Sequence, residues 1–281
     1  MKKGISIWAF TDPSLENCFR LAKQAGYDGV EVALAETGAL RLDSTKEEIL
    51  QIKQLAETTG VELYSVASGL YWSYPLTAND PVIQQKAIEI CRRQLDAAAL
   101  LGCDTILVIP GQVGSLDGSG EVVPYDVAYD RAFSVITQLA LYAEEKKVTI
   151  AIENVWNKFL LSPLEMRNFI DSIGNPYVKA YFDVGNVVKD GYPDQWIHIL
   201  GERIAKVHFK DYKATVGTLD GFVDLLNGSV DYPAVITALE DVGYDGWVTA
   251  EVFPYTHSPE TLLYTSSAAM DAILSKKGKQ Q

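Results

Sequence analysis

The sequence predicts a (β/α)₈ TIM barrel, formed as one domain by residues 1–281. Eight short apolar runs alternate along the chain with eight segments that carry helix start and stop signals. These runs lack strict apolar–polar alternation, which is typical of parallel strands that are covered on both faces. A Gly-Tyr-Asp-Gly segment that opens at Gly26 returns at Gly243, each time just before a predicted strand. The repeat indicates that one structural unit is used twice.

The elements follow one another in a regular order. Strands are predicted at 4–10, 29–34, 61–67, 105–110, 148–153, 178–183, 204–209 and 247–251. Helices are predicted after Asp12 or Ser14, after Ser44, at 81–101, at 125–145, after Ser162, at 193–200, after Asp231 and at 258–274. Gly26, Gly60 and Gly102 stop helices, because glycine accepts the left-handed conformation at a helix C-terminus. Pro81 and Pro163 stand where proline suits the first helical turn.

An open, doubly wound sheet is the competing architecture. Such a sheet normally carries a glycine-rich phosphate-binding turn after its first strand. The segment 9–12, Ala-Phe-Thr-Asp, contains no glycine. No linker rich in proline or serine divides the chain, so a single closed barrel is favoured.

Composition restricts the possible partners and the compartment. The formal net charge of −13 repels phosphate backbones, so nucleic acid is not expected as a partner. The three cysteines, Cys18, Cys91 and Cys103, are few and far apart, which favours reduced thiols in a cytoplasmic protein. No apolar run reaches transmembrane length, so no membrane association is expected.

Charged side chains mark the exits of the last four predicted strands. Glu153, Asp183, His208 and Glu251 end the fifth, sixth, seventh and eighth strands, and His208 is one of only three histidines. In a (β/α)₈ barrel, the C-terminal ends of the strands converge on one mouth. Three carboxylates brought together there would repel one another, and a divalent cation would remove the conflict. Three oxygen ligands and one nitrogen suit Mn²⁺ best, then Mg²⁺ or Co²⁺, with Zn²⁺ also possible.

Each of these residues also has a plain structural interpretation. Glu153 is able to pair with Lys210, Asp183 is able to cap the turn at Gly185, and His208 alone would be an ordinary barrel histidine. The coincidence of all four at successive strand exits favours the metal site.

The segments around these residues resemble a known family. Ile152-Glu153-Asn154, Phe182–Asn186, Val207–Asp211 and Ala250-Glu251 are similar to the xylose-isomerase-like barrels of sugar and sugar-phosphate isomerases and epimerases. The run Val207–Lys213 resembles most closely the L-ribulose-5-phosphate and L-xylulose-5-phosphate 3-epimerases. The resemblance covers the whole chain and is strongest from 148 to 253.

The resemblance implies an isomerase in which Glu153 and Glu251 bind the metal and also exchange the substrate proton. One carboxylate removes a proton next to a carbonyl, and the other returns it on the opposite face, through a metal-stabilised enediolate. Return to the neighbouring carbon would instead give aldose–ketose isomerisation, and the sequence leaves both outcomes open. The expected substrate is a sugar or a sugar phosphate. Homo-oligomers are common in the family, so one is possible here.

Five further residues are predicted to bind substrate. Epimerases of free ketohexoses carry a histidine at the position of Asn186, so the asparagine favours a different sugar. Lys210 and Lys213 suit a phosphate group, and Trp8 and Trp72 suit the apolar face of a sugar. The two lysines also have a simple surface interpretation, and the two tryptophans a packing interpretation.

Three other functions compete with the isomerase. A barrel endonuclease acting on abasic DNA needs a histidine-rich site, and His198 and His257 do not end strands. An inosose-type dehydratase shares the ligand set and remains an alternative. A non-catalytic sugar-binding barrel is the remaining alternative, although it would not require both Glu153 and Glu251.

Overall fold

A computed structural model describes residues 1–115 and 118–275. Within them, eight parallel strands close into a barrel in the order β1-β10-β7-β6-β5-β4-β3-β2, as the sequence predicts. The barrel strands are β1 (Lys2–Ser6), β2 (Gly29–Ala33), β3 (Glu62–Ala67), β4 (Thr105–Val108), β5 (Thr149–Glu153), β6 (Val178–Asp183), β7 (Ile204–Phe209) and β10 (Trp247–Ala250). Eight helices alternate with these strands along the described chain: α1 (Leu15–Ala25), α2 (Lys46–Thr59), α3 (Pro81–Leu101), α4 (Tyr125–Lys146), α5 (Pro163–Ile173), α6 (Pro193–Leu200), α7 (Tyr232–Asp241) and α8 (Glu260–Ser275).

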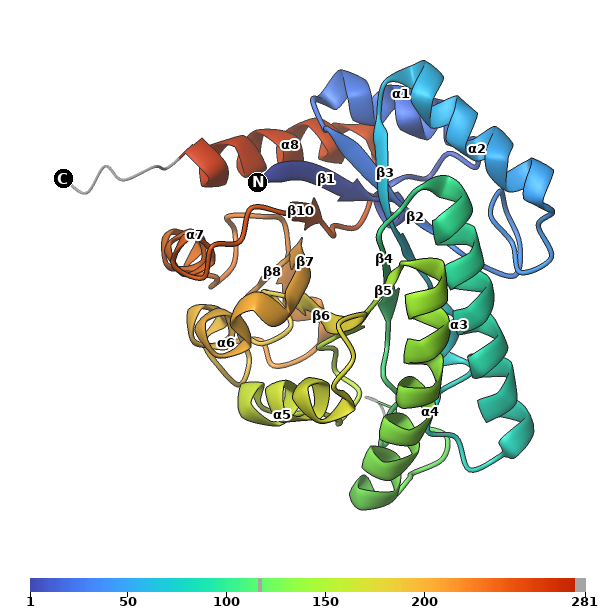
Figure 1. Cartoon of the computed structure of the whole chain (residues 1–281). Helices are drawn as coiled ribbons and strands as arrows, with labels where there is room; N and C mark the ends of the chain where they lie inside the picture. Colours follow the sequence, from blue (N-terminus) through green and yellow to red (C-terminus); the bar gives the residue numbers. More distant parts are fainter. Residues whose placement is uncertain (116–117, 276–281) are drawn as a thin grey trace. The chain divides into compact units, whose positions relative to one another are not determined.

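Two compact units make up the chain. In the unit formed by residues 1–31, 54–63 and 182–281, β1 pairs with both β2 and β10, and β10 pairs with β7. Helix α8 packs against α1 and α7, and α6 and α7 lie side by side (Figure 1). In the unit formed by residues 32–53 and 64–181, β4 pairs with β3 and β5, and α4 packs against α3 and α5.

Helix signals in the sequence act as expected at most ends. Ser14, Asp80, Ser162 and Asp231 cap α1, α3, α5 and α7 through their side chains. Gly26 and Gly102 end their helices in the left-handed conformation. The prediction that Ser44 caps α2 is wrong by one residue. Thr45 Oγ1 accepts the Glu48 N–H, and the Glu48 carboxylate accepts the Thr45 N–H, so the capping box begins at Thr45.

Strand ends differ more from the prediction than strand positions do. β1 ends at Ser6 and not at Phe10, because Ile7–Ala9 forms a short 3₁₀ turn, η1, whose Trp8 N–H is donated to Ser6 Oγ. Trp8 therefore follows β1 and does not lie within it. A hairpin absent from the prediction lies between β7 and α7, where β8 (Asp211–Tyr212) pairs with β9 (Phe222–Val223) in antiparallel register.

Three more short turns complete the described elements. They are the 3₁₀ turns η2 (Gly69–Trp72), η3 (Gly201–Arg203) and η4 (Leu219–Gly221). Cys18 and Cys91 lie in α1 and α3, Cys103 precedes β4, and all three are buried and free. No helix of the described chain is both long enough and apolar enough to span a membrane.

Candidate metal centre

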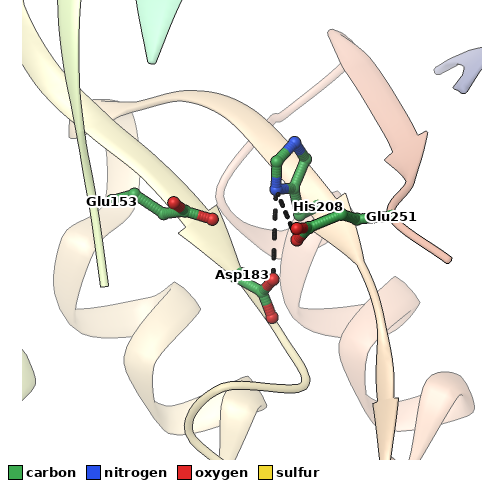
Figure 2. A group of neighbouring side chains, drawn as sticks. All are labelled: Glu153, Asp183, His208 and Glu251. Atoms are coloured by element: carbon green, nitrogen blue, oxygen red, sulfur yellow. Dashed lines mark ion pairs between the residues drawn. The ribbon is translucent and has the colours of Figure 1, made fainter. Parts of the chain in front are cut away.

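The four residues predicted as ligands come from strand ends. Glu153 and Asp183 are the last residues of β5 and β6, His208 is the penultimate residue of β7, and Glu251 directly follows β10. All four side chains are buried. Each offers one ligand atom, and these atoms all lie within 4.8 Å of one another. Figure 2 shows the four side chains directed toward one another. The structure therefore brings the four predicted residues together.

Backbone hydrogen bonds fix three of these strand ends in the unit that contains β7. Val184 N–H is donated to the carbonyl of His208, and Glu251 N–H is donated to the carbonyl of Phe209. Gly185 packs closely against the backbone that follows β7, because a Cβ on Gly185 would lie 2.7 Å from the Lys210 carbonyl oxygen. Glycine is therefore needed where the chain leaves β6, and the ends of β6, β7 and β10 are held in register.

His208 faces the carboxylates through one ring nitrogen. Nδ1 lies 3.1 Å from Glu251 Oε2 and 3.9 Å from Asp183 Oδ2 (Figure 2). Asp183 Oδ1 accepts the backbone N–H of Asn186, so this carboxylate also caps the turn after β6. The capping role and the ligand role are thus compatible, because they use different oxygens.

Lys210 brings a positive charge directly to the carboxylates. Its Nζ lies 2.8 Å from Glu251 Oε2 and 3.6 Å from Asp183 Oδ2. The ammonium also lies 4.9 Å from the centre of the Phe222 ring and 5.7 Å from that of Phe253. The hairpin that was not predicted therefore supplies one aromatic face to Lys210.

The charges around Glu251 determine its ionisation. Burial alone raises the pKa of Glu251, but the nearby charges of Lys210 and His208 lower it by more, so its pKa lies below the usual range. Glu251 is therefore a carboxylate at neutral pH. Within the described residues, Glu251 Oε2 is buried and makes no hydrogen bond of good geometry, although it lies close to the side chains of Lys210 and His208.

A divalent cation fits this donor set. Three buried carboxylates and one imidazole nitrogen are hard and borderline ligands of the kind that Mn²⁺, Mg²⁺, Co²⁺ and Zn²⁺ accept. Glu251 Oε2 is a buried acceptor without a well-formed hydrogen bond, which a metal ion would satisfy. The cluster could hold one metal ion.

Asp211 holds the segment that follows β7. Its buried carboxylate accepts the backbone N–H groups of Tyr212, Gly228 and Val230, at 2.8, 3.0 and 3.1 Å. Burial raises the pKa of Asp211, while the donated N–H groups oppose the rise. A side chain on Gly228 would collide with this carboxylate, so the close approach requires glycine. Asp211 thus ties together both ends of the segment that carries Lys213 and Phe222.

The predicted substrate-binding residues fall in different surroundings. Lys210 is in the cluster, and Asn186 is half-buried next to Asp183 through its backbone N–H. Lys213 is exposed at the end of β8, and Trp8 is half-buried in η1. Trp72 lies in η2, after β3, and 47% of it is exposed.

One buried carboxylate at this centre was missed in the sequence. Glu31 Oε1 lies 3.0 Å from Nε2 of His208, and both side chains are fully shielded from solvent. The internal repeat gives no direct signal for it, because Glu31 stands five residues after Gly26, whereas the matching position in the second copy is Val248.

The match to a family model decides the family of this chain. Residues 19–273 match the model described as xylose isomerase-like TIM barrel. The chain belongs to this family. The resemblance seen in the sequence is therefore confirmed.

Relatives of this chain include proteins that are named as epimerases. The L-ribulose-5-phosphate 3-epimerase UlaE of Salmonella paratyphi A is 26% identical over 248 residues, which are 84% of this chain and 81% of the relative. Epimerases are isomerases, so the prediction of an isomerase is confirmed at the level of enzyme class.

Solved structures of other proteins share the fold of this chain. D-psicose 3-epimerase with D-tagatose from Clostridium cellulolyticum H10 has a TM-score of 0.80 and 18% identity, with 98% of both chains covered. The IOLI protein with a binding zinc atom has a TM-score of 0.81 and 17% identity, with 100% of both chains covered.

Proposed function

We propose that this chain is a divalent-metal-dependent epimerase that inverts carbon 3 of a ketopentose phosphate. The observation that carries the proposal is the cluster of three carboxylates and one imidazole at strand ends, with ligand atoms within 4.8 Å of one another. The name of the Salmonella relative, an L-ribulose-5-phosphate 3-epimerase, supports the choice of substrate. The proposed metal is Mn²⁺, and a zinc atom in the IOLI structure supports a divalent ion on this fold.

The proposed reaction needs two proton carriers on opposite faces of the sugar. Glu153 and Glu251 take these roles, and Asp183 and His208 complete the ligand set. One glutamate takes the proton from carbon 3, and the electron pair of the broken C–H bond moves toward the carbonyl oxygen at carbon 2. The other glutamate returns a proton to carbon 3 on the opposite face. When bound, the cation would hold the carbonyl and hydroxyl oxygens and stabilise the developing negative charge.

Residues around the cluster are proposed to bind the rest of the sugar. Lys210 carries positive charge next to Glu251 and Asp183, where a substrate oxygen would lie, so we assign it to the reacting end. The exposed Lys213 is then the better candidate for the phosphate group. Asn186 is proposed to bond a hydroxyl group, and Trp8 and Trp72 are proposed to contact sugar carbons.

The proposed setting is a cytoplasmic barrel of one domain over residues 1–281. Three free, buried cysteines support a reducing compartment. Assembly into a homo-oligomer stays a prediction.

Proton exchange with solvent tests the reaction directly. With Mn²⁺ present, we expect deuterium from D₂O to enter carbon 3 of a ketopentose 5-phosphate as its epimer appears, measured by NMR over a panel of ketoses and ketose phosphates. Loss of water from an inosose would instead support the dehydratase. Metal and sugar binding without exchange on any substrate would contradict the enzyme and support a sugar-binding barrel.

Replacing Lys213 by alanine tests the phosphate assignment. We expect KM for the phosphorylated ketose to rise about fivefold, the effect of one exposed charge contact of about 1 kcal/mol, while KM for the free ketose stays the same. Lys23→Ala, which removes an exposed lysine on α1, is the matched control. An equal change for both sugars would contradict the assignment.

A further inference from the structure

Carboxylates lie against both ring nitrogens of His208. Nδ1 faces Glu251 and Asp183, at 3.1 and 3.9 Å. Nε2 faces Glu31 Oε1 at 3.0 Å. Glu31 does not belong to the four-residue ligand cluster, so the mechanism described above leaves it without a role.

Glu31 and His208 lie on β2 and β7, which are separated in the barrel by β1 and β10. Glu31 pairs with Ser6 of β1, β1 also pairs with β10, and Thr249 of β10 pairs with His208. Glu31 and His208 are both fully buried, so bulk water does not solvate their polar atoms. A buried N–H group needs an acceptor, and Glu31 supplies one to Nε2.

A neutral imidazole carries one proton, on one of its two nitrogens. With the proton on Nε2, the ring donates a hydrogen bond to Glu31, and Nδ1 turns a bare lone pair toward Glu251 and Asp183. With the proton on Nδ1, two lone-pair acceptors would face each other at Nε2 and Glu31, and Nδ1 would have no lone pair for a cation. When a cation satisfies Nδ1, Glu251 and Asp183, the buried Glu31 carboxylate therefore selects the tautomer that is able to bind it.

We propose that Glu31 is a positioning residue that fixes the Nε2–H tautomer and the ring orientation of His208, so that Nδ1 is presented as a metal ligand. This inference rests on the metal site of the proposed function. Carboxylate partners of ligand histidines commonly strengthen metal binding in this way. Glu31 touches neither the substrate nor the cation, and its effect passes through the imidazole.

Two variants separate the charge of Glu31 from its hydrogen bond. Glu31→Gln keeps an oxygen acceptor and removes the charge, and Glu31→Leu removes both. We expect the affinity for Mn²⁺, measured by competition with a chelating dye, to fall about 10-fold in the first and about 100-fold in the second. Gln94→Leu is the matched control, because it removes buried hydrogen bonds to Val66 and Leu107 without touching His208. We expect this control to lose thermal stability and to keep its metal affinity.

A second readout does not depend on metal or on activity. Nitrogen-15 NMR of the metal-free protein is expected to show a proton held on Nε2 of His208 in the wild type and a mixture of protonated and unprotonated Nε2 in Glu31→Leu. His208→Gln identifies its signals among those of the three histidines. Unchanged metal affinity in both folded Glu31 variants would overturn the inference, as would a wild-type Nδ1–H tautomer. A wild type with the expected tautomer and no affinity for divalent cations would overturn the metal site itself, which separates the two failures.

Discussion

Replacing Glu251 by glutamine is expected to lower the rate of epimerisation by about 10²–10⁴-fold, the contribution typical of one acid–base group. Glutamine has nearly the same shape, but its amide cannot take a proton from carbon. The amide is also a weaker metal ligand, so the rate is measured at Mn²⁺ concentrations that saturate the variant. Glu260→Gln is the matched control, because it makes the same change of charge at an exposed position at the start of α8.

The partner variant, Glu153→Gln, makes this prediction sharper. If each glutamate serves one face of the sugar, each single variant should lose epimerisation but still exchange the carbon 3 proton of one epimer with solvent. The epimer that exchanges should differ between Glu251→Gln and Glu153→Gln. Deuterium incorporation into each pure epimer measures this difference. Epimerisation within tenfold of the wild type in Glu251→Gln would remove Glu251 from the proton transfer, and exchange of the same epimer in both variants would contradict the use of two bases.

The fold and most of the metal centre follow from local sequence signals. The order of strands and helices is set by short apolar runs that are closed by glycine, proline and polar caps, and these signals act within a few residues. The ligand residues were predictable because, in a barrel of this type, the C-terminal ends of all strands lie at the same mouth. Correct strand positions were therefore enough to find Glu153, Asp183 and His208. Glu251 was found as well, although it follows β10 directly and is not its last residue.

The features that were missed depend on contacts between distant segments. The β8–β9 hairpin contains two residues in each strand, too few to produce a period in the sequence. Its position is fixed by hydrogen bonds that the backbone N–H groups of Gly228 and Val230 donate to the Asp211 carboxylate. These two residues follow Asp211 by 17 and 19 positions in the chain. Trp8 was placed in a strand because its neighbours are apolar, although Ser6 turns the chain first by accepting its N–H.

Glu31 was missed for a different reason. It stands inside an apolar strand rather than at a visible exit, and a single charge there is usually an edge or surface residue. The contact with His208 on β7, 177 residues away in the chain, is what relates this carboxylate to the site. The repeated Gly-Tyr-Asp-Gly segment does not single out Glu31, because the second copy carries Val248 at the matching position.

Replacing His208 by alanine is expected to remove the bound metal and the activity together. Loss of a residue that only orients a ligand costs about 10–100-fold in metal affinity, so loss of the ligand itself should cost more than about 100-fold. Metal content after dialysis, measured by atomic emission, and epimerisation at saturating Mn²⁺ are the two readouts. Circular dichroism checks the fold, because the change also removes the hydrogen bond between Glu31 and the imidazole and leaves a buried cavity.

Asp183→Asn keeps the test decisive if the alanine variant does not fold. The asparagine retains an oxygen that accepts the Asn186 N–H, so the turn after β6 is preserved while one negative charge at the centre is lost. We expect a folded protein whose metal affinity and activity fall together and are partly restored by excess Mn²⁺. A folded His208→Ala variant that holds one equivalent of metal would exclude the imidazole from the ligand set. The contact of His208 with Glu31 and Glu251 would then be a buried ion-pair network of the barrel, and the carboxylates alone would have to hold the cation.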